Sequence, residues 1–241
     1  MKKLVVIITI LILFIPKVNA STSSASSYIL MDSTTGRVLM SKDMHSKRLI
    51  ASITKIMTAT LAIESGKLND VVEVSPIIKE AYGSGIYIEV GEEITLKDLV
   101  YGLMLRSGND AAMMISEYIG GTTEEFVNMM NKKAKELGMK ETTFYNPSGL
   151  PTPSGNYSSV YDMALLTKYA MNSPVYQEIV KTKTYKVTTN KKTYLWHNKN
   201  KLLKYDFYDV YNFDWESSPH FSIIKDVPSV ESNITHVERE I

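Results

Sequence analysis

Cysteine is absent from the 241 residues, which excludes disulfide bonds, a thiol nucleophile and cysteine-ligated metal. An excess of charge of one sign is also missing, since 27 basic and 26 acidic residues give a net charge of +1. Neither nucleic acid nor an anionic membrane surface is therefore expected as a partner. The four histidines show no metal-ligand spacing and predict no metal site: His45, His197, His220 and His236.

Long hydrophobic runs are missing except at the N-terminus. Lysines at positions 2 and 3 precede an apolar run from Leu4 to Ile15, and Val18-Asn19-Ala20 resembles a cleavage site. The run is shorter than the ~20 residues of a membrane span. We predict a signal peptide at residues 1–20 and an exported protein, which touches the membrane only through this segment if it stays uncleaved.

The rest of the chain has the composition of a folded domain, with 44% hydrophobic and 22% charged residues. Two strand-like runs around Asp32 to Gly36 predict a hairpin, and Ser52 to Ser65 predicts a buried helix that ends at Gly66. Capping patterns predict further helices that start near these residues: Thr95, Asn109, Thr122, Ser159 and Ser173. A second hairpin is expected around Thr189-Asn190, so the fold class is α+β.

Ser52 and Lys55 form the pair with the greatest chemical potential. A serine hydroxyl needs a base to become a nucleophile, and residues at i and i+3 share a helix face. Burial in an apolar helix favours the neutral lysine amine that could accept the proton. The spacing alone is weak, because Ser222 and Lys225 repeat it, so the apolar helix start is what favours Ser52.

Ser107-Gly108-Asn109 lies between two predicted helices, where a turn can hold a hydroxyl and an amide toward a cleft. Ser107 could relay a proton and Asn109 could orient a peptide substrate. Ser154-Gly155-Asn156 repeats the tripeptide in a Pro- and Gly-rich loop. We prefer the first copy, because flanking helices position side chains better than a loop does.

With these motifs in place, the chain resembles the serine-type D-alanyl-D-alanine carboxypeptidases, low-molecular-weight penicillin-binding proteins related to class A β-lactamases. The resemblance covers roughly residues 27–203. Segments outside the two motifs share it: Met31-Asp32, Gly91-Glu92-Glu93, Leu103 to Ala112, Asn146 to Leu150 and Tyr161 to Ala164. It implies a β-lactamase-like fold, with a helical subdomain and an antiparallel sheet.

The resemblance also implies the chemistry. Ser52 would attack the terminal D-Ala-D-Ala bond of a peptidoglycan stem peptide, and Lys55 would act as the base. Ser107 would assist proton transfer, Asn109 would bind substrate, and the Ser52 N–H would supply half of an oxyanion hole. β-Lactams would acylate the same serine, and no metal or cofactor is implied.

The family's third motif, Lys-Thr-Gly, does not occur in this sequence. The last glycine is Gly155, whereas the motif should follow Leu203. We therefore expect an incomplete domain at residues 21–210 and a divergent tail at 211–241, produced by truncation or a frameshift. On this interpretation the last sheet strands are missing, the inner edge of the first hairpin is unpaired, and activity is low.

Two alternatives stay open. The chain could be a non-catalytic remnant or a peptidoglycan-binding protein, in which Ser52 reacts with nothing. It could also be a β-lactamase, although the Glu-x-x-Leu-Asn pattern that positions a deacylating water in class A enzymes is absent from the sequence.

Overall fold

The computed structural model describes residues 25–151, 154–200, 203, 210–213 and 221–224, all within the compact unit Ala25–Pro228. The predicted signal peptide at residues 1–20 lies outside these residues. Within the described ranges, none of the helices combines the length and the apolar character that crossing a membrane requires.

Helix α2 (Lys55–Glu64) is the buried centre of the helical part. It follows a single 3₁₀ turn, η1 (Ala51–Thr54), and every residue of α2 from Lys55 to Ala62 is buried. Such burial on all sides is expected for a helix of Ile, Met, Ala, Thr and Leu with one charge near its start. The helix ends before Gly66, whose φ of +71° is the left-handed conformation that glycine adopts easily.

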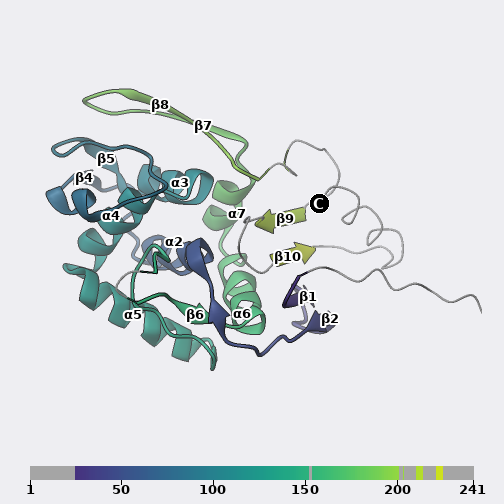
Figure 1. Ribbon diagram of the computed structural model, residues 1–241. Coiled ribbons are helices and arrows are strands. Elements are labelled where there is room, and N and C mark those ends of the chain that lie inside the picture. The colour runs from purple at the N-terminus through teal and green to yellow at the C-terminus, as the bar shows by residue number, and fades with distance from the viewer. Residues whose placement is uncertain (1–24, 152–153, 201–202, 204–209, 214–220, 225–241) are drawn as a thin grey trace, which may run out of the picture. The chain divides into compact units, whose positions relative to one another are not determined.

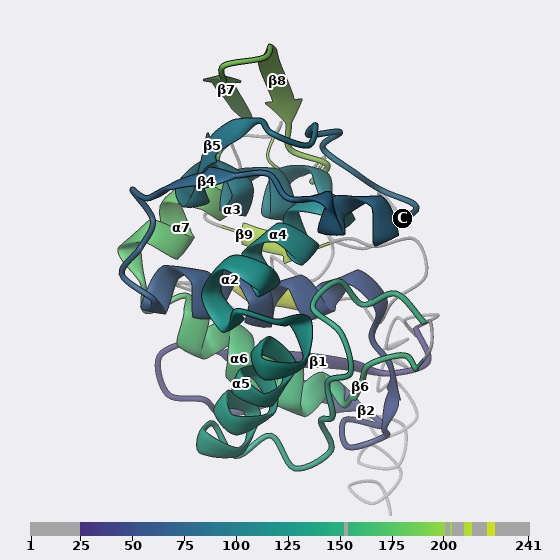
Figure 2. The same cartoon turned by 90° about the vertical axis from the view of Figure 1, so that its left-hand side faces the viewer.

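Five more helices surround α2, and each of them contacts it: α3 (Leu96–Arg106), α4 (Asn109–Gly120), α5 (Thr123–Glu136), α6 (Val160–Ala170) and α7 (Pro174–Lys181). Figure 2 shows α2 in the middle of this group. Most of the predicted caps are confirmed, because Thr95, Thr122 and Ser159 accept hydrogen bonds from the backbone N–H groups of Asp98, Glu125 and Asp162, and Ser173 caps α7 in the same way. Helix α4 differs, since its N-cap is Gly108, which makes no side-chain cap bond.

The predicted second hairpin consists of β7 (Thr184–Thr188) and β8 (Thr193–His197), and β8 packs on α3. Tyr185 of β7 stacks on Tyr101 of α3, with ring centroids 3.6 Å apart. The buried Trp196 extends this aromatic contact and packs against Tyr194. The hairpin is thereby fixed to α3 and carries the chain back toward Leu105 at the end of that helix.

Two short strand pairs and one 3₁₀ helix lie in the segments that connect the main helices. Strands β3 (Arg48–Leu49) and β6 (Tyr157–Ser158) pair just before η1, and β4 (Val71–Glu73) pairs with β5 (Glu93–Thr95) before α3. The 3₁₀ helix η2 (Pro76–Glu80) packs on α4.

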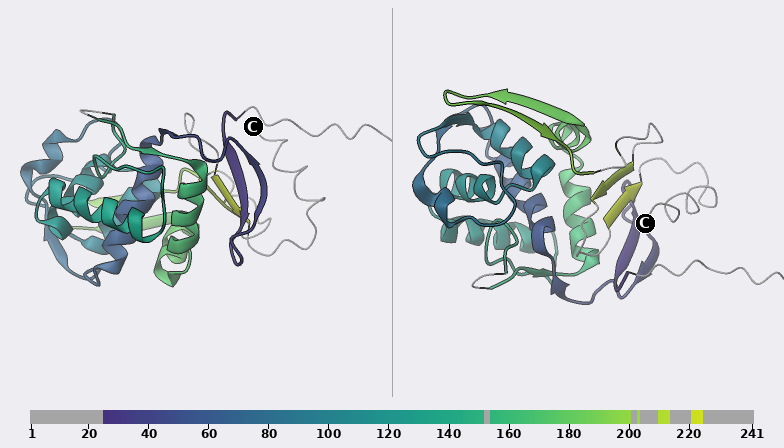
Figure 3. Two further views of the ribbon diagram at one scale, coloured as in Figure 1. Left: turned by 90° about the horizontal axis from the view of Figure 1, so that it is seen from below. Right: turned by 45° about the horizontal axis from the view of Figure 1, so that its top comes forward.

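The main sheet has the strand order β2-β1-β10-β9, and Figures 1 and 3 show β1 and β2 on the α6 side of the helices. It contains the predicted N-terminal hairpin, β1 (Tyr28–Asp32) and β2 (Val38–Lys42), with β9 (Val210–Phe213) and β10 (Phe221–Ile224). Strand β10 pairs in parallel with β1, so that Ile29 lies opposite Phe221.

The α+β class is confirmed, but three details of the expected sheet are wrong. The inner edge of β1 is paired, and the tail contributes two strands to the sheet. The sheet is mixed rather than purely antiparallel. A four-residue run such as Phe221–Ile224 is too short to show an alternating pattern, and the direction of a strand pair depends on the path of the connecting chain.

Candidate active site

Ser52 and Lys55 are brought together as their spacing predicts. Ser52 lies in the 3₁₀ turn η1 and Lys55 is the first residue of α2. The Nζ atom of Lys55 donates a hydrogen bond to the Oγ atom of Ser52 over 3.0 Å. This distance is within the range at which a base can accept a proton from a hydroxyl.

Lys55 lies in a site that disfavours its charged form. Its side chain is 3% exposed, and its Nζ also donates to the backbone carbonyl of Ser148 over 2.6 Å. Burial lowers the pKa of Lys55 from 10.5 to about 7; the positive charge of Lys199 lowers it further, and the carboxylate of Asp110 opposes the shift. Near neutral pH, a substantial fraction of Lys55 is therefore a neutral amine that can act as a base.

The described residues of the loop between Asn146 and Asn156, which are 146–151 and 154–156, pack against this pair. Thr58 of α2 donates to the carbonyl of Pro147 over 2.6 Å, while Lys55 bonds the next carbonyl. Asn156 is fully buried, and its Nδ2 donates to the Oγ1 of Thr54 and to the carbonyl of Asn146. Its Oδ1 accepts the N–H groups of Tyr145 and Asn146, so one amide closes the loop against η1.

Asn156 belongs to Ser154-Gly155-Asn156, the second copy of the Ser-Gly-Asn tripeptide. From the sequence, the first copy is preferred as a site, because the second lies in a loop. The structure gives Asn156 a positioning role beside the Ser52 turn, although it brings no chemistry of its own. The full burial of an asparagine in a Pro- and Gly-rich loop could not be predicted from the sequence, because its partners Thr54 and Asn146 lie 102 and 10 positions away.

Ser107 is the residue that connects α3 to α4. It adopts a left-handed conformation with φ +60° and ψ +40°, which is uncommon for a residue other than glycine. Its side chain is 3% exposed, and its Oγ has no hydrogen-bond partner among the described residues. Backbone strain combined with an unpaired hydroxyl is typical of functional positions.

Asn109 and Asp110, the first residues of α4, hold the loop before Ile88 in place. The Nδ2 of Asn109 donates to the carbonyl of Tyr82 over 2.6 Å. The carboxylate of Asp110 accepts the backbone N–H groups of Ile86 and Tyr87, the latter over 2.7 Å. The sequence explains Asp110 only as an acid in the first helical turn, and it gives no sign of this long-range contact.

The described part of the chain contains no cluster of three His, Asp or Glu side chains able to hold a metal ion. A serine with a neutral lysine within hydrogen-bond distance, at the start of a buried helix, is the arrangement of acyl-transfer enzymes that use a serine nucleophile.

Comparisons with known proteins agree with this class. The sequence profile of the family "D-alanyl-D-alanine carboxypeptidase" matches residues 16–213. This chain belongs to that family.

Curated relatives share substantial sequence identity. The carboxypeptidase DacF of Bacillus subtilis is 44% identical over 191 residues, which are 75% of this chain and 48% of that protein. The carboxypeptidase DacC of Escherichia coli is 36% identical over 200 residues, 77% of this chain and 48% of that protein. The chain thus spans about half the length of these curated relatives.

Solved structures show the same fold. A D-alanyl-D-alanine carboxypeptidase from Mycobacterium tuberculosis superposes with a TM-score of 0.75 at 26% identity, over 81% of this chain and 75% of that one. A mutant of the Streptomyces K15 DD-transpeptidase also gives 0.75 at 28% identity, over 83% and 84%. The predicted fold class, helices together with a sheet as in the DD-peptidases, is confirmed by these superpositions.

Proposed function

We propose that this chain acts as a serine-type D-alanyl-D-alanine carboxypeptidase on peptidoglycan stem peptides. The observation that carries the proposal is the 3.0 Å hydrogen bond between Lys55 and Ser52, made by a lysine whose pKa is lowered to about 7. The family membership and the names of the relatives support the same activity.

In the proposed reaction, the neutral amine of Lys55 takes the proton of the Ser52 hydroxyl as Oγ attacks the carbonyl carbon of the penultimate D-alanine. The backbone N–H of Ser52 donates to the developing oxyanion. The C–N bond then breaks, the leaving D-alanine amine takes up a proton, and an acyl-serine ester remains. Water hydrolyses this ester to free the shortened stem peptide and restore the serine.

Ser107 and Asn109 have supporting roles in this proposal. The Oγ of Ser107 has no hydrogen-bond partner in the described part of the chain, and it is available to pass the proton toward the leaving amine. Asn109 orients the substrate backbone with the part of its amide that does not bond the Tyr82 carbonyl. Neither role needs a metal or a cofactor.

The sequence contains no Lys-Thr-Gly, so it lacks the groups which that motif supplies in the resembling family. Losing one oxyanion donor reduces turnover by about 10² to 10³-fold. We therefore expect slow acylation rather than none. The protein would act outside the cytoplasm, where its substrate is found, after export through the N-terminal segment.

A fluorescent penicillin tests this function, since β-lactams would acylate the same serine. We expect a stable covalent adduct that Ser52→Ala abolishes. Ser222→Ala is the matched control, because Ser222 has the same spacing to a lysine but no place in the proposed site. Rapid release of hydrolysed penicillin would instead support a β-lactamase, and folded protein that never labels would support a non-catalytic remnant.

A further inference from the structure

Tyr87 lies in the segment between η2 and β5 and has a backbone conformation that tyrosine seldom adopts. Its φ is +60°, in the left-handed region, where a bulky side chain is strained. The backbone N–H donates to the carboxylate of Asp110 over 2.7 Å, and the carbonyl accepts from the Nζ of Lys192 over 2.8 Å and from the hydroxyl of Tyr194 over 3.3 Å. Groups from α4 and from the β7–β8 hairpin therefore hold this conformation from both ends of the residue.

The fold gains little from the ring of Tyr87. The side chain is 72% exposed, and it forms no hydrogen bond, ion pair or ring contact within the part of the chain that the structure describes. Glycine occupies the other positive-φ positions of the same segment, Gly83 at +80° and Gly91 at +75°, and it would adopt the conformation of residue 87 without strain. A strained tyrosine whose ring is in solvent indicates a role for the ring outside the fold.

The other strained residues indicate where such a role is expected. Besides Tyr87, the described non-glycine residues with a positive φ are Asp43, Ala51 and Ser107. Aspartate tolerates this conformation in turns, and Asp43 lies in the bend that follows β2. Ala51 precedes the proposed nucleophile, and Ser107 is the proposed proton relay. Strain of this kind is therefore found at the candidate active site.

The segment that carries Tyr87 packs directly on the start of α4. A Cβ atom at Gly85 would lie 3.1 Å from the carboxylate of Asp110, the group that binds the N–H of Tyr87. Burial is the main cause of the lowered pKa of Lys55, and the same carboxylate opposes that shift, so it lies within electrostatic range of the amine. Tyr87 therefore borders the site at which Asn109 is proposed to orient the substrate.

The proposed substrate contains a group that suits an exposed phenol ring. The D-alanine released by the reaction carries only a methyl group, whereas the residue before D-Ala-D-Ala can carry a longer side chain. An aromatic ring contributes to binding through the large apolar area that it covers, and a long side chain provides that area. We propose that Tyr87 is a specificity-determining residue whose ring contacts the side chain that precedes D-Ala-D-Ala. This inference rests on the proposed function, because it concerns the substrate of the same site.

The test compares two N-acetylated peptides that end in D-Ala-D-Ala and differ only in the residue before it, Nε-acetyl-lysine in one and glycine in the other. We expect the wild-type kcat/KM to be about tenfold higher for the lysyl peptide. Tyr87→Ala and Tyr87→Gly should remove this preference by raising KM for the lysyl peptide, whereas Tyr87→Phe retains the ring and should keep it. Tyr87→Gly should also raise the melting temperature, because the backbone strain is relieved. An unchanged preference in Tyr87→Ala would overturn the inference.

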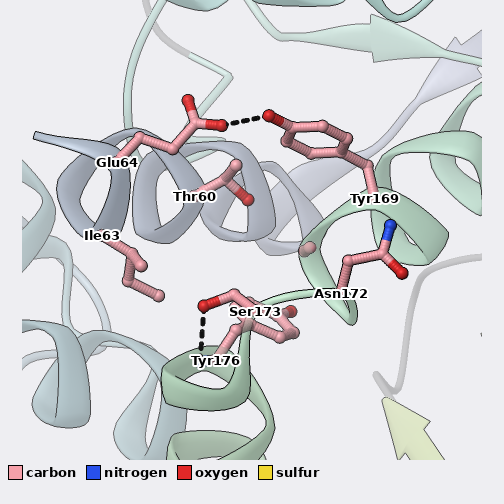
Figure 4. A pocket seen from close by; sticks show the side chains of 8 residues that line it. Thr60, Ile63, Glu64, Tyr169, Asn172, Ser173 and Tyr176 are labelled. Carbon is pink, nitrogen blue, oxygen red and sulfur yellow. Dashed lines mark hydrogen bonds between the residues drawn. The ribbon is translucent and has the colours of Figure 1, made fainter.

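Tyr169→Ala is the matched control for the loss of a tyrosine ring. Tyr169 is 36% exposed and lines a hollow beside the end of α2, where its hydroxyl bonds Glu64 (Figure 4). Glu64 is the last residue of α2 and Lys55 is the first, so this ring lies at the other end of the helix from the site. The variant should lower the melting temperature without changing the peptide preference. Loss of the preference in Tyr169→Ala as well would assign the effect to destabilisation and contradict a contact at Tyr87.

Binding to Ser52→Ala separates this inference from the proposed function. The variant lacks the nucleophile, but it should bind the lysyl peptide and show intermolecular nuclear Overhauser effects between the Tyr87 ring and the lysine side chain. If the wild type cleaves neither peptide while Ser52→Ala shows this contact, the reaction is wrong and the contact is confirmed. If the wild type cleaves both peptides and the ring shows no contact, the proposed function stands and the inference is overturned.

Discussion

Gly149 packs against the carbonyl group of Ala51, and a Cβ atom at position 149 would lie 1.8 Å from that oxygen. The same Cβ would lie 2.9 Å from the backbone nitrogen of Ser52, the proposed oxyanion donor. Gly149 also has a φ of +87°, and Ala51 has a φ of +42°. The loop that contains Gly149 and the turn η1 that contains Ser52 therefore fit together only because residue 149 has no side chain.

Gly149→Ala should displace the turn that presents Ser52. We expect a loss of about 2 to 4 kcal/mol in the free energy of unfolding, from the clash and the left-handed backbone together. Penicillin labelling should slow by at least about tenfold, because the Ser52 N–H is obstructed. Chemical denaturation and labelling rates measure the two effects.

Gly138→Ala is the matched control for this change. Gly138 has a φ of +74°, but a Cβ added there would meet no atom within 4 Å, so the substitution carries the backbone penalty without the clash. It should lower the unfolding free energy by only about 1 kcal/mol and leave labelling unchanged. Equal effects of the two substitutions would contradict the importance of the contact with Ala51.

The pH dependence of acylation follows from the lowered pKa of Lys55. Only the neutral amine can accept the Ser52 proton, so the labelling rate should rise with pH, with a midpoint near 7, and then level off. Lys55→Arg should remove labelling at every pH, because a guanidinium keeps its proton. A flat profile in the wild-type protein would argue against Lys55 as the base.

The same pKa shift predicts how stability depends on pH. Between about 7 and the ordinary value of 10.5, the unfolded chain binds a proton at Lys55 that the folded chain has released. The free energy of unfolding should therefore rise with pH across this window relative to Lys55→Met, which has no such group. Parallel denaturation series at about pH 7 and about pH 9.5 measure the difference; a constant difference would contradict the shift.

Much of the helical fold could be predicted from the sequence, because its signals are local. Thr95, Thr122 and Ser159 lie within three positions of the N–H groups that they cap, and Gly66 ends α2 by its own conformation. The Ser52–Lys55 pair is equally local, since it spans one helical turn. Both partners of each of these interactions lie within a few positions of each other, so a short stretch of sequence is enough to predict them.

The rest of the site depends on contacts between distant segments. Lys55 bonds the carbonyl of Ser148 across 93 positions, and the fully buried Asn156 bonds Thr54 across 102. A backbone carbonyl carries no sequence signature, and an asparagine in a loop looks the same whether it is exposed or buried. The pairing of β10 with β1 could not be predicted for the same reason, because edge pairing is set by tertiary structure.

Ser107 offers a prediction in which stability and activity move in opposite directions. Ser107→Gly removes the left-handed strain and the unpaired buried hydroxyl, so the free energy of unfolding should rise by about 1 kcal/mol. Labelling should fall, since the proposed proton relay is lost. Ser107→Ala also removes the hydroxyl but keeps the strained backbone, so it should lower labelling with a smaller gain in the free energy of unfolding than Ser107→Gly. Normal labelling in both variants would exclude Ser107 from the reaction.

Lys199 and Asp110 should move the pH profile in opposite directions. Lys199 lowers the pKa of Lys55 and Asp110 raises it, after the larger effect of burial. Lys199→Gln should therefore shift the midpoint of the labelling profile to higher pH, whereas the exposed Lys135→Gln on α5 should not move it. Asp110→Asn should shift the midpoint to lower pH, because a neutral amide no longer favours the protonated lysine.

Asp110→Asn also separates electrostatics from structure. The substituted amide keeps one oxygen for the N–H groups of Ile86 and Tyr87, but it loses the charge that strengthens both hydrogen bonds. We expect a loss of about 1 to 3 kcal/mol in the free energy of unfolding and faster amide exchange at residues 86 and 87. If the midpoint moved to higher pH instead, the electrostatic account of Asp110 would be wrong.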